Sequence, residues 1–316
     1  MDLSIVVVNW NTRELLAQCL ASVTTNSDRQ GSNVAILPAT YPLESVTYEL
    51  FVVDNASTDG SAQMVAEHFP WVHLIANSEN VGFACANNQA IRQSIGRYIL
   101  LLNSDTEVHP GALETMVQFM ERQPQAGGCG PRLLNADDSL QPSCHPMLTP
   151  GREFWRLLFL DWVWRRATYV QERWDWGTPH PVEVIKGACF MLRRAALDRV
   201  GLLDEEYFMY TEEMDLCYRL LQDGWQLWWV PQAVVKHYGE ASSRQVAKSM
   251  YIQLYRSKVQ FHRKFGGRRQ ADCFKRLIFL AYIPRFALAR LGSLVFSSYA
   301  DRAHTYRRLL AELPQM

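Results

Sequence analysis

Hydrophobic and polar positions alternate in blocks over the first 122 residues of the chain. Apolar runs fit for buried strands end abruptly in polar residues, and segments with a helical period lie between them. The expected strands cover 3–8, 49–53, 72–75 and 98–102, and the expected helices cover 13–23, 57–69, 84–94 and 113–122. Strands that alternate with helices through short loops predict βαβ units and a mainly parallel sheet. The first part of the chain therefore indicates an α/β fold.

The pattern changes in the second half. Residues 142–181 are rich in Trp and Pro, which predicts an irregular, partly helical stretch. Further strands are expected at 182–192 and 225–235, with a helix at 211–222 between them. From residue 245 onward, basic residues are interleaved with aromatic and aliphatic ones, which predicts two or three amphipathic helices.

Charge is distributed unevenly, although the formal net charge of the 316 residues is zero. Residues 245–316 contain 14 Lys and Arg against three acidic residues, a net of +11, so the first 244 residues carry −11. An acidic body with a basic tail is not typical of an enzyme that acts on nucleic acid. It fits better a body that binds a metal ion and a tail that touches an anionic surface.

Cysteines and hydropathy indicate a cytoplasmic setting. The seven cysteines are scattered, odd in number and form no Cys-x-x-Cys pair, which is typical of reduced thiols. The N-terminus enters a strand at Leu3 without the basic start and apolar core of a secretory signal. The most apolar tail segment, 277–296, is interrupted by Pro284, Arg285 and Arg290, so we predict no transmembrane helix.

Polar clusters follow several of the expected strands. They are Asn9–Asn11, Asp54–Gly60, Asn80–Phe83 and Asn103–Asp105. Each cluster alone is more typical of an Asx turn or a helix cap. However, parallel strands bring their carboxyl ends to one edge, where α/β proteins bind ligands. Trp10 could stack on a nucleobase, Asp54 could accept a hydrogen bond from base or ribose, and Asp105 could hold Mg²⁺ or Mn²⁺ on a diphosphate.

An acidic cluster begins the helix expected at 211–222. Glu212, Glu213 and Asp215 lie within four residues, more than the helix dipole alone explains. A carboxylate here could deprotonate an acceptor hydroxyl, because crowded acids raise one another's pKa towards neutrality. Glu213 or Glu212 is the candidate base, and Asp215 is expected to pair with Arg219 one helical turn on.

Two further segments carry candidate residues. Lys186-Gly187-Ala188 permits close approach of a substrate to the backbone, with a strand bulge as the structural alternative. His237 follows an expected strand in a loop that contains Gly and Ser. A lone histidine is more often structural, but this position makes a ligand role plausible.

In this order, the clusters resemble the family 2 glycosyltransferases of the GT-A fold, and within them the rhamnosyltransferase-like branch. The resemblance covers about 3–243. It rests on the motifs at 8–11, 53–60, 80–84, 102–106, 186–188, 201–205, 208–216 and 237–239. It implies a GT-A domain at 1–243, followed by a basic amphipathic helical extension at 244–316. The nucleotide half would be about 1–110 and the acceptor half about 111–243.

The resemblance also implies roles for individual residues. Asp105 corresponds to the last acid of the family's Asp-x-Asp metal motif, whose first position here is Asn103, and His237 corresponds to a metal or diphosphate contact. Glu213 corresponds to the catalytic base, usually Asp in the family, so Glu212 stays open as the alternative. The implied donor nucleotide contacts are Asn9, Trp10, Asp54, Asn80, Gly82, Phe83, Asn103 and Ser104. The implied acceptor-side residues are Lys186, Gly187 and Arg219.

The implied activity is inverting, single-displacement sugar transfer, with rhamnose as the expected sugar. The donor would be a nucleotide-diphosphate sugar, the acceptor a hydroxyl of a glycan or polyprenyl-linked glycan, and the cofactor Mg²⁺ or Mn²⁺. A non-catalytic GT-A module that binds sugar nucleotide or glycan is the alternative. A sugar nucleotidyltransferase is disfavoured because no Gly-rich loop follows the first strand. The tail either touches the inner face of the cell membrane, packs on the body or forms a dimer contact.

Overall fold

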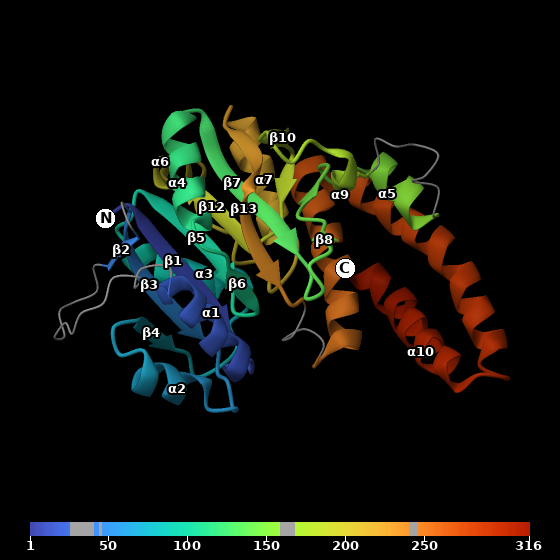
Figure 1. Ribbon diagram of the computed structural model, residues 1–316. Coiled ribbons are helices and arrows are strands. Elements are labelled where there is room, and N and C mark those ends of the chain that lie inside the picture. Colours follow the sequence, from blue (N-terminus) through green and yellow to red (C-terminus); the bar gives the residue numbers. More distant parts are fainter. Residues whose placement is uncertain (26–40, 44–45, 159–167, 240–244) are drawn as a thin grey trace. The chain divides into compact units, whose positions relative to one another are not determined.

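The computed structural model describes residues 1–25, 41–43, 46–158, 168–239 and 245–316 (Figure 1). These residues form two compact units. The first, here the sheet unit, comprises Met1–His145, Val170–Phe208 and Glu212–Gln245. The second, here the helical unit, comprises Pro146–Tyr169, Met209–Thr211 and Val246–Met316.

The centre of the sheet unit is parallel, as the sequence predicts. Its strands are β1 (Leu3–Asn9), β3 (Val46–Asp54), β4 (His73–Ala76) and β5 (Tyr98–Asn103). β1 pairs in parallel with both β3 and β5, and β3 pairs in parallel with β4. In this register Asn9 lies opposite Asp54, and Val8 lies opposite Asn103. The polar residues that end these strands therefore meet at one edge of the sheet.

The flanking strands make the sheet mixed. They are β2 (Tyr41–Leu43), β6 (Thr106–Val108), β7 (Ala126–Leu134), β8 (Leu140–Gln141), β10 (His180–Val182), β12 (Cys189–Arg193) and β13 (Gln226–His237). Among the described residues the order is β10-β13-β7-β12-β5-β1-β3-β2, with β4, β6 and β8 paired beside this path. β12 runs antiparallel to β5 and β7, whereas β13 is parallel to β7 and antiparallel to β6.

The single strand expected at 182–192 is divided. β9 (Cys144–His145) pairs with β11 (Val184–Ile185) in a separate two-stranded sheet, and the chain then changes sheet before β12 begins. In the gap, Lys186 N donates to Ser143 O and Ala188 O accepts from Asn103 N, both at 2.9 Å. The break occurs because the backbone here bonds in turn to two different partners.

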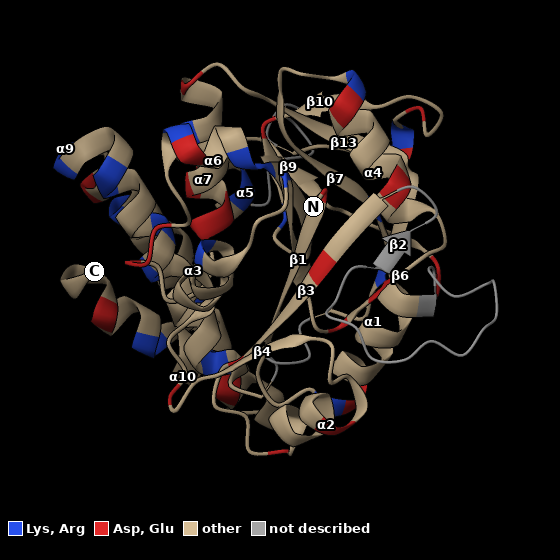
Figure 2. Ribbon diagram, turned by 90° about the vertical axis from the view of Figure 1, so that its left-hand side faces the viewer, with Lys and Arg blue, Asp and Glu red and all other residues tan. Residues whose placement is uncertain are grey.

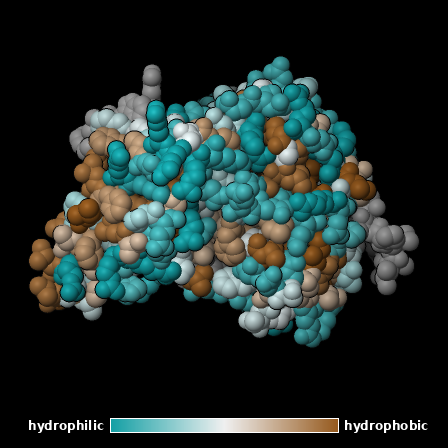
Figure 3. Space-filling view, turned by 180° about the vertical axis from the view of Figure 1, so that it is seen from behind, coloured by the Kyte–Doolittle hydropathy of each residue, from teal (hydrophilic) through white to brown (hydrophobic). Residues whose placement is uncertain are grey.

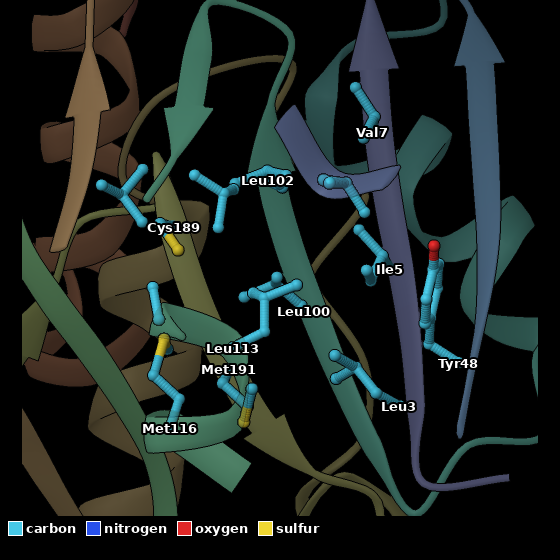
Figure 4. Packing of buried hydrophobic residues seen from close by; sticks show 14 of the residues in the cluster. Leu3, Ile5, Val7, Tyr48, Leu100, Leu102, Leu113, Met116, Cys189 and Met191 are labelled. Carbon is cyan, nitrogen blue, oxygen red and sulfur yellow. The ribbon is translucent and has the colours of Figure 1, made fainter. Parts of the chain in front are cut away.

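Helices cover the sheet of this unit. They are α1 (Arg13–Thr25), α2 (Ser61–His68), α3 (Phe83–Gln93), α4 (Ala112–Arg122), α6 (Arg194–Val200) and α7 (Glu212–Gln222), with a 3-10 turn η1 (Gln171–Arg173). Figure 4 shows Leu3, Ile5 and Val7 of β1 packed beside Leu100 and Leu102 of β5. Val6 on the opposite face of β1 is also fully buried. Burial on both faces explains why these strands are continuous apolar runs.

The helical unit contains α5 (Pro150–Leu157), α9 (Ala247–Gly292), α10 (Ser297–Glu312) and a final 3-10 turn η2 (Leu313–Gln315). Gly267, with φ 69°, interrupts α9, so the tail has three helical segments, within the predicted two or three. Its own core includes Tyr255, Phe274, Ile278 and Leu309. In the described part of the chain, no helix has the length and apolarity needed to cross a bilayer.

Candidate functional site

A buried hydrogen-bond network joins the ends of β1, β3 and β5. Asn9 Nδ2 donates to Asp54 Oδ1 at 3.0 Å and to Ser57 Oγ at 3.1 Å, and Asn9 Oδ1 accepts from Thr12 Oγ1 at 2.6 Å. The Thr12 hydroxyl is also 2.8 Å from Ser104 Oγ. Asn9, Asp54 and Ser104 are buried, so these contacts fix the orientation of the Asp54 carboxylate at the sheet edge. Trp10, in the next position, is partly exposed.

A second network orders the loop that precedes α3. Asn55 Nδ2 donates to Asn80 Oδ1 at 2.9 Å, and Asn55 Oδ1 accepts from Val81 N at 3.1 Å. Gly82 has φ 86°, and a Cβ built on it would lie 2.5 Å from the carbonyl oxygen of Phe208. That carbonyl accepts a 2.8 Å bond from Phe83 N. Only glycine permits the two loops to approach so closely. The motif Asn80–Phe83 thus has a structural role in holding the loop before α3.

Asp105 and His237 meet at the carboxyl end of β5, although 132 positions separate them in the sequence. His237 Nε2 lies 3.2 Å from Asp105 Oδ1 and 3.4 Å from Asn103 Nδ2. The backbone holds the pair together, because Tyr238 N donates to Asp105 O at 2.9 Å and β13 pairs with β6 next to it. Tyr238 Oη also donates to Glu107 Oε2 at 2.7 Å. The predicted carboxylate and imidazole are thus brought together.

Asp105 and His237 fit a divalent cation whose remaining ligands would come from a substrate. Asp105 offers a carboxylate oxygen and His237 an imidazole nitrogen, and Asn103 lies beside them. In the described part of the chain, no group of three or more His, Cys, Asp or Glu side chains could hold a metal ion without other ligands. Mg²⁺ commonly binds through one or two carboxylates together with water and substrate phosphates. A cation held by Asp105 and His237 would need such additional ligands.

The loop Lys186–Ala188, here the Gly187 loop, lies between Asn103, next to the Asp105 and His237 pair, and the acidic start of α7. Ala188 O accepts from Asn103 N at 2.9 Å, and a Cβ built on Gly187 would lie 3.9 Å from Glu213 Cβ and 3.6 Å from a ring carbon of Phe83. Asn103 and Glu213 therefore contact neighbouring residues of one short loop. The sequence predicts each of these segments as functional, and the fold brings them to the same region of the sheet unit.

The two glutamates at the start of α7 differ in environment. Glu212 is 4% exposed, and its Oε2 has no hydrogen-bond partner within the described residues. Burial, and then the neighbouring charge of Glu213, raises the pKa of Glu212 well above its usual range. Glu213 is only partly buried as a residue, although its Oε2 is enclosed like that of Glu212. The raised pKa of Glu212 disfavours the ionised form that a general base requires.

The backbone reaches these glutamates in an unusual conformation. Tyr210 and Thr211 have φ values of 67° and 75°, in the left-handed region that non-glycine residues rarely adopt. Two such residues in succession cost free energy that the surrounding structure must offset. The sequence offers no glycine here that would have signalled the turn.

Arg219 is occupied by the fold. Its Nε donates to Asp215 Oδ1 at 2.6 Å, which confirms the expected pair, and its two terminal nitrogens donate to the carbonyls of Val200, Gly201 and Leu202. These carbonyls belong to the end of α6 and the turn after it. Through these contacts Arg219 links α7 to α6. The acceptor-side role of Arg219 remains a prediction.

Two polar residues that are not among the predicted site residues take part in the site. Ser57 Oγ accepts hydrogen bonds from Asn9 Nδ2 and Asn11 N, and Gln141 Oε1 lies 2.6 Å from His237 Nδ1. Ser57 stands inside the predicted Asp54–Gly60 cluster, so a signal for it exists. Gln141 stands in the two-residue strand β8, 96 positions from His237, and local sequence carries no sign of this contact.

Comparison with protein families gives a match over more than half of the chain. Residues 4–201 match the family described as Glycosyl transferase family 2. An N-acetylglucosaminyl-diphospho-decaprenol L-rhamnosyltransferase of Mycobacterium tuberculosis is 30% identical over 251 residues, which cover 75% of this chain and 76% of the relative. The low-salt glycan biosynthesis hexosyltransferase Agl10 of Haloferax volcanii is 26% identical over 226 residues, covering 69% of this chain and 61% of the relative.

Solved structures with a similar fold are also glycosyltransferases. The mannosyltransferase PcManGT of Pyrobaculum calidifontis, in complex with GDP-Man and Mn²⁺, superposes with a TM-score of 0.52 at 17% identity, covering 98% of this chain and 85% of that chain. S. aureus TarS 1-349 gives 0.53 at 15% identity, covering 100% and 92%. GalNAc-T7 with UDP, GalNAc and Mn²⁺ gives 0.54 at 16% identity, covering 75% and 44%. At these identities the likeness establishes a common fold.

Proposed function

Because the chain belongs to glycosyltransferase family 2 and has the GT-A fold, we propose that it is an inverting, metal-assisted sugar transferase. The observation that carries the proposal is the convergence of three predicted groups in one unit. Asp54 lies at the end of β3, the Asp105 and His237 pair lies at the end of β5, and Glu213 lies against the Gly187 loop. This arrangement supports a site in which Asp54 would contact the donor nucleotide, a cation on Asp105 and His237 would hold the diphosphate, and Glu213 would act as the base.

We assign the general base to Glu213. Its carboxylate would take the proton of an acceptor hydroxyl, and the oxygen would attack the anomeric carbon from the face opposite the nucleotide. The bond from that carbon to the diphosphate breaks as the new glycosidic bond forms. Glu212 is not assigned as the base, because burial raises its pKa and disfavours its ionised form. A divalent cation held by Asp105 and His237 would stabilise the charge that develops on the departing diphosphate.

The names of the relatives support a proposal for the donor sugar and the acceptor. The mycobacterial relative is named as a rhamnosyltransferase that acts on N-acetylglucosaminyl-diphospho-decaprenol. We therefore propose a nucleotide-diphosphate rhamnose as donor and a polyprenyl-diphosphate-linked sugar as acceptor. The solved structures with Mn²⁺ support Mn²⁺ or Mg²⁺ as the cofactor.

Calorimetry with a panel of sugar nucleotides would test this assignment. dTDP-rhamnose, UDP-glucose, UDP-N-acetylglucosamine and GDP-mannose would each be titrated with and without Mn²⁺ into the wild type, Asp105→Ala and Asp198→Ala. Asp198 is exposed on α6 and provides the matched control. We expect metal-dependent binding of dTDP-rhamnose that weakens at least about tenfold in Asp105→Ala alone. Absence of binding to every donor, by folded protein supplied with acceptor, would contradict the proposal.

A lipid-linked acceptor requires access to a membrane, and the helical unit offers a surface for it. The end of α9 and the turn into α10 expose a run of large apolar side chains, among which Leu294 is 82% exposed. The run comprises Leu288, Leu291, Leu294, Val295 and Phe296. It contributes to the brown patch at the left edge of Figure 3, and Figure 2 shows Lys and Arg recurring along α9. We propose that this turn enters the interface of an anionic membrane at the cytoplasmic face.

Sedimentation with phosphatidylglycerol vesicles would test the membrane contact. The double variant Leu294→Ser/Phe296→Ser would be compared with Ile95→Ser, which replaces a 69% exposed apolar residue of the sheet unit. We expect the double variant alone to lose vesicle binding while it retains activity on a water-soluble acceptor. Unchanged vesicle binding, or a change in oligomeric state instead, would assign the turn to another contact.

A further inference from the structure

Gln141 contacts His237 through both ends of its side-chain amide. Its Oε1 lies 2.6 Å from His237 Nδ1, and its Nε2 donates to the His237 backbone oxygen at 3.2 Å. Nε2 also donates to Asn135 Oδ1 at 2.8 Å. The three contacts leave the imidazole with one ring nitrogen against Gln141 and the other facing Asp105.

The orientation of the Gln141 amide follows from two backbone carbonyls, Leu140 O and His237 O, which can only accept hydrogen bonds. Asn135 Nδ2 donates to the Leu140 backbone oxygen at 3.4 Å and to Ser139 Oγ at 2.9 Å, so Asn135 Oδ1 must face Gln141. Gln141 then turns its nitrogen towards two acceptors, Asn135 Oδ1 and His237 O, and its oxygen towards the imidazole. An amide oxygen cannot donate, so His237 Nδ1 carries the hydrogen.

The tautomer decides what His237 presents to the sheet edge. With the hydrogen on Nδ1, a neutral imidazole has its lone pair on Nε2, which lies 3.2 Å from Asp105 Oδ1. Two electron-rich atoms at this separation favour a shared cation. Metal-bound histidines usually donate their second ring N–H to a carboxylate, a backbone carbonyl or water, which fixes the tautomer. Here the acceptor is a glutamine oxygen.

The turn between β7 and β8 keeps Gln141 in position. Asn135 N donates to Ser139 O at 2.8 Å, Ser139 Oγ donates to Asp137 Oδ1 at 2.6 Å, and Asp138 adopts a left-handed φ of 64°. The antiparallel register of β7 and β8 then sets Gln141 beside Leu133. The neighbour of His237 on β13, Lys236, forms an ion pair with Asp138 of the same turn at 2.7 Å. The turn is therefore tied to the histidine strand at two points.

From these contacts we propose that Gln141 is a positioning residue for the metal site. It holds His237 as the Nδ1–H tautomer and thereby directs Nε2 at the cation shared with Asp105. The proposal rests on the metal-assisted function above, but the tautomer itself can be measured without metal or substrate. Failure of the one can thus be told from failure of the other.

The experiment combines ¹⁵N-histidine NMR of the metal-free protein with Mn²⁺ binding in the presence of dTDP, followed by electron paramagnetic resonance. The variants are Gln141→Leu, which removes the acceptor, and Gln141→Glu, which retains an obligate acceptor for Nδ1. Gln125→Leu is the matched control, because Gln125 is exposed just before the first residue of β7 and its side chain accepts a hydrogen bond from Gln226. Thermal melting of each variant establishes that it is folded.

We expect Nδ1–H in the wild type, in Gln141→Glu and in the control, and a shift towards the Nε2–H tautomer in Gln141→Leu. Mn²⁺ affinity should fall about 10- to 100-fold in Gln141→Leu and stay within about threefold in the control. An Nε2–H wild type would overturn the inference, as would a folded Gln141→Leu that keeps both Nδ1–H and wild-type affinity. If Gln141→Leu does not fold, loss of Nδ1–H in Gln141→Glu would overturn it equally. A wild type with Nδ1–H but no Mn²⁺ binding would instead refute the proposed metal-assisted function.

Discussion

The replacement Glu212→Gln should make the protein more stable than the wild type at neutral pH. Glu212 is 4% exposed, and its Oε2 has no hydrogen-bond partner within the described residues. Burial and the charge of Glu213 hold the pKa of Glu212 well above its usual value of 4.5 in the folded state. The unfolded chain releases this proton near pH 4.5, whereas the folded protein retains it. Unfolding therefore releases a proton, and rising pH favours the unfolded state.

The size of the effect follows from this linkage. Above about pH 5 the wild type loses roughly 1.4 kcal/mol of stability per pH unit, relative to a variant that cannot ionise, until the folded-state pKa is reached. Glutamine has nearly the same shape and carries no charge, so it abolishes this term. The stability difference between Glu212→Gln and the wild type should grow with pH in favour of the variant, and should become constant below about pH 4.

Denaturant unfolding at several pH values between 4 and 8 would measure this difference. Every other ionisable group is common to both proteins, so subtraction reports position 212 together with its coupling to Glu213. Glu67→Gln is the control for the substitution itself, because Glu67 is exposed on α2. A difference that is flat with pH, or one that favours the wild type as pH rises, would refute the reasoning. Either result would mean that Glu212 is ionised in the folded protein and competes with Glu213 as the base.

Three further predictions concern the same unit. Glu213→Gln should lower turnover by about 10²- to 10⁴-fold and leave donor affinity within about twofold in calorimetry, because only proton transfer is removed. Arg219→Met should destabilise the protein by about 3–5 kcal/mol in denaturant unfolding, since it removes the cation that is paired with the buried carboxylate of Asp215. Gly82→Ala should cost clearly more stability than Gly111→Ala. Both glycines have a positive φ, but the new Cβ would clash with Phe208 at position 82, whereas no atom lies within 4 Å of it at position 111.

Each of these has an outcome that contradicts it. Full turnover of Glu213→Gln would remove that residue from the reaction and favour the reading of a module that only binds. A loss below about 1 kcal/mol in Arg219→Met would be typical of an exposed ion pair. Equal losses at Gly82 and Gly111 would show that backbone conformation alone, without the contact to Phe208, accounts for the need for glycine.

Local pattern was sufficient to predict the parallel centre of the fold and the residues at its edge. A doubly buried strand is a near-continuous apolar run, and the carboxyl ends of parallel strands lie at the same edge of the sheet. Asn9, Asp54 and Asn103 are therefore recognisable from hydrophobicity and position alone, and the register of β1 with β3 and β5 bears this out. The pair formed by Asp215 and Arg219 was predictable for the same reason, since helical spacing fixes it.

Only the tertiary structure decided the contacts between residues that are far apart in the sequence. The antiparallel insertion of β12, the division of the strand expected at 182–192, and the place of Gln141 beside His237 depend on which strand pairs with which. Hydrophobic periodicity records whether a residue is buried but not the identity of its neighbour, so it leaves these choices open. The same limit applied to Glu212 and Glu213. The sequence placed two acids at one helix start, and only the folded chain shows that Glu212 is the more buried of the two and that burial raises its pKa.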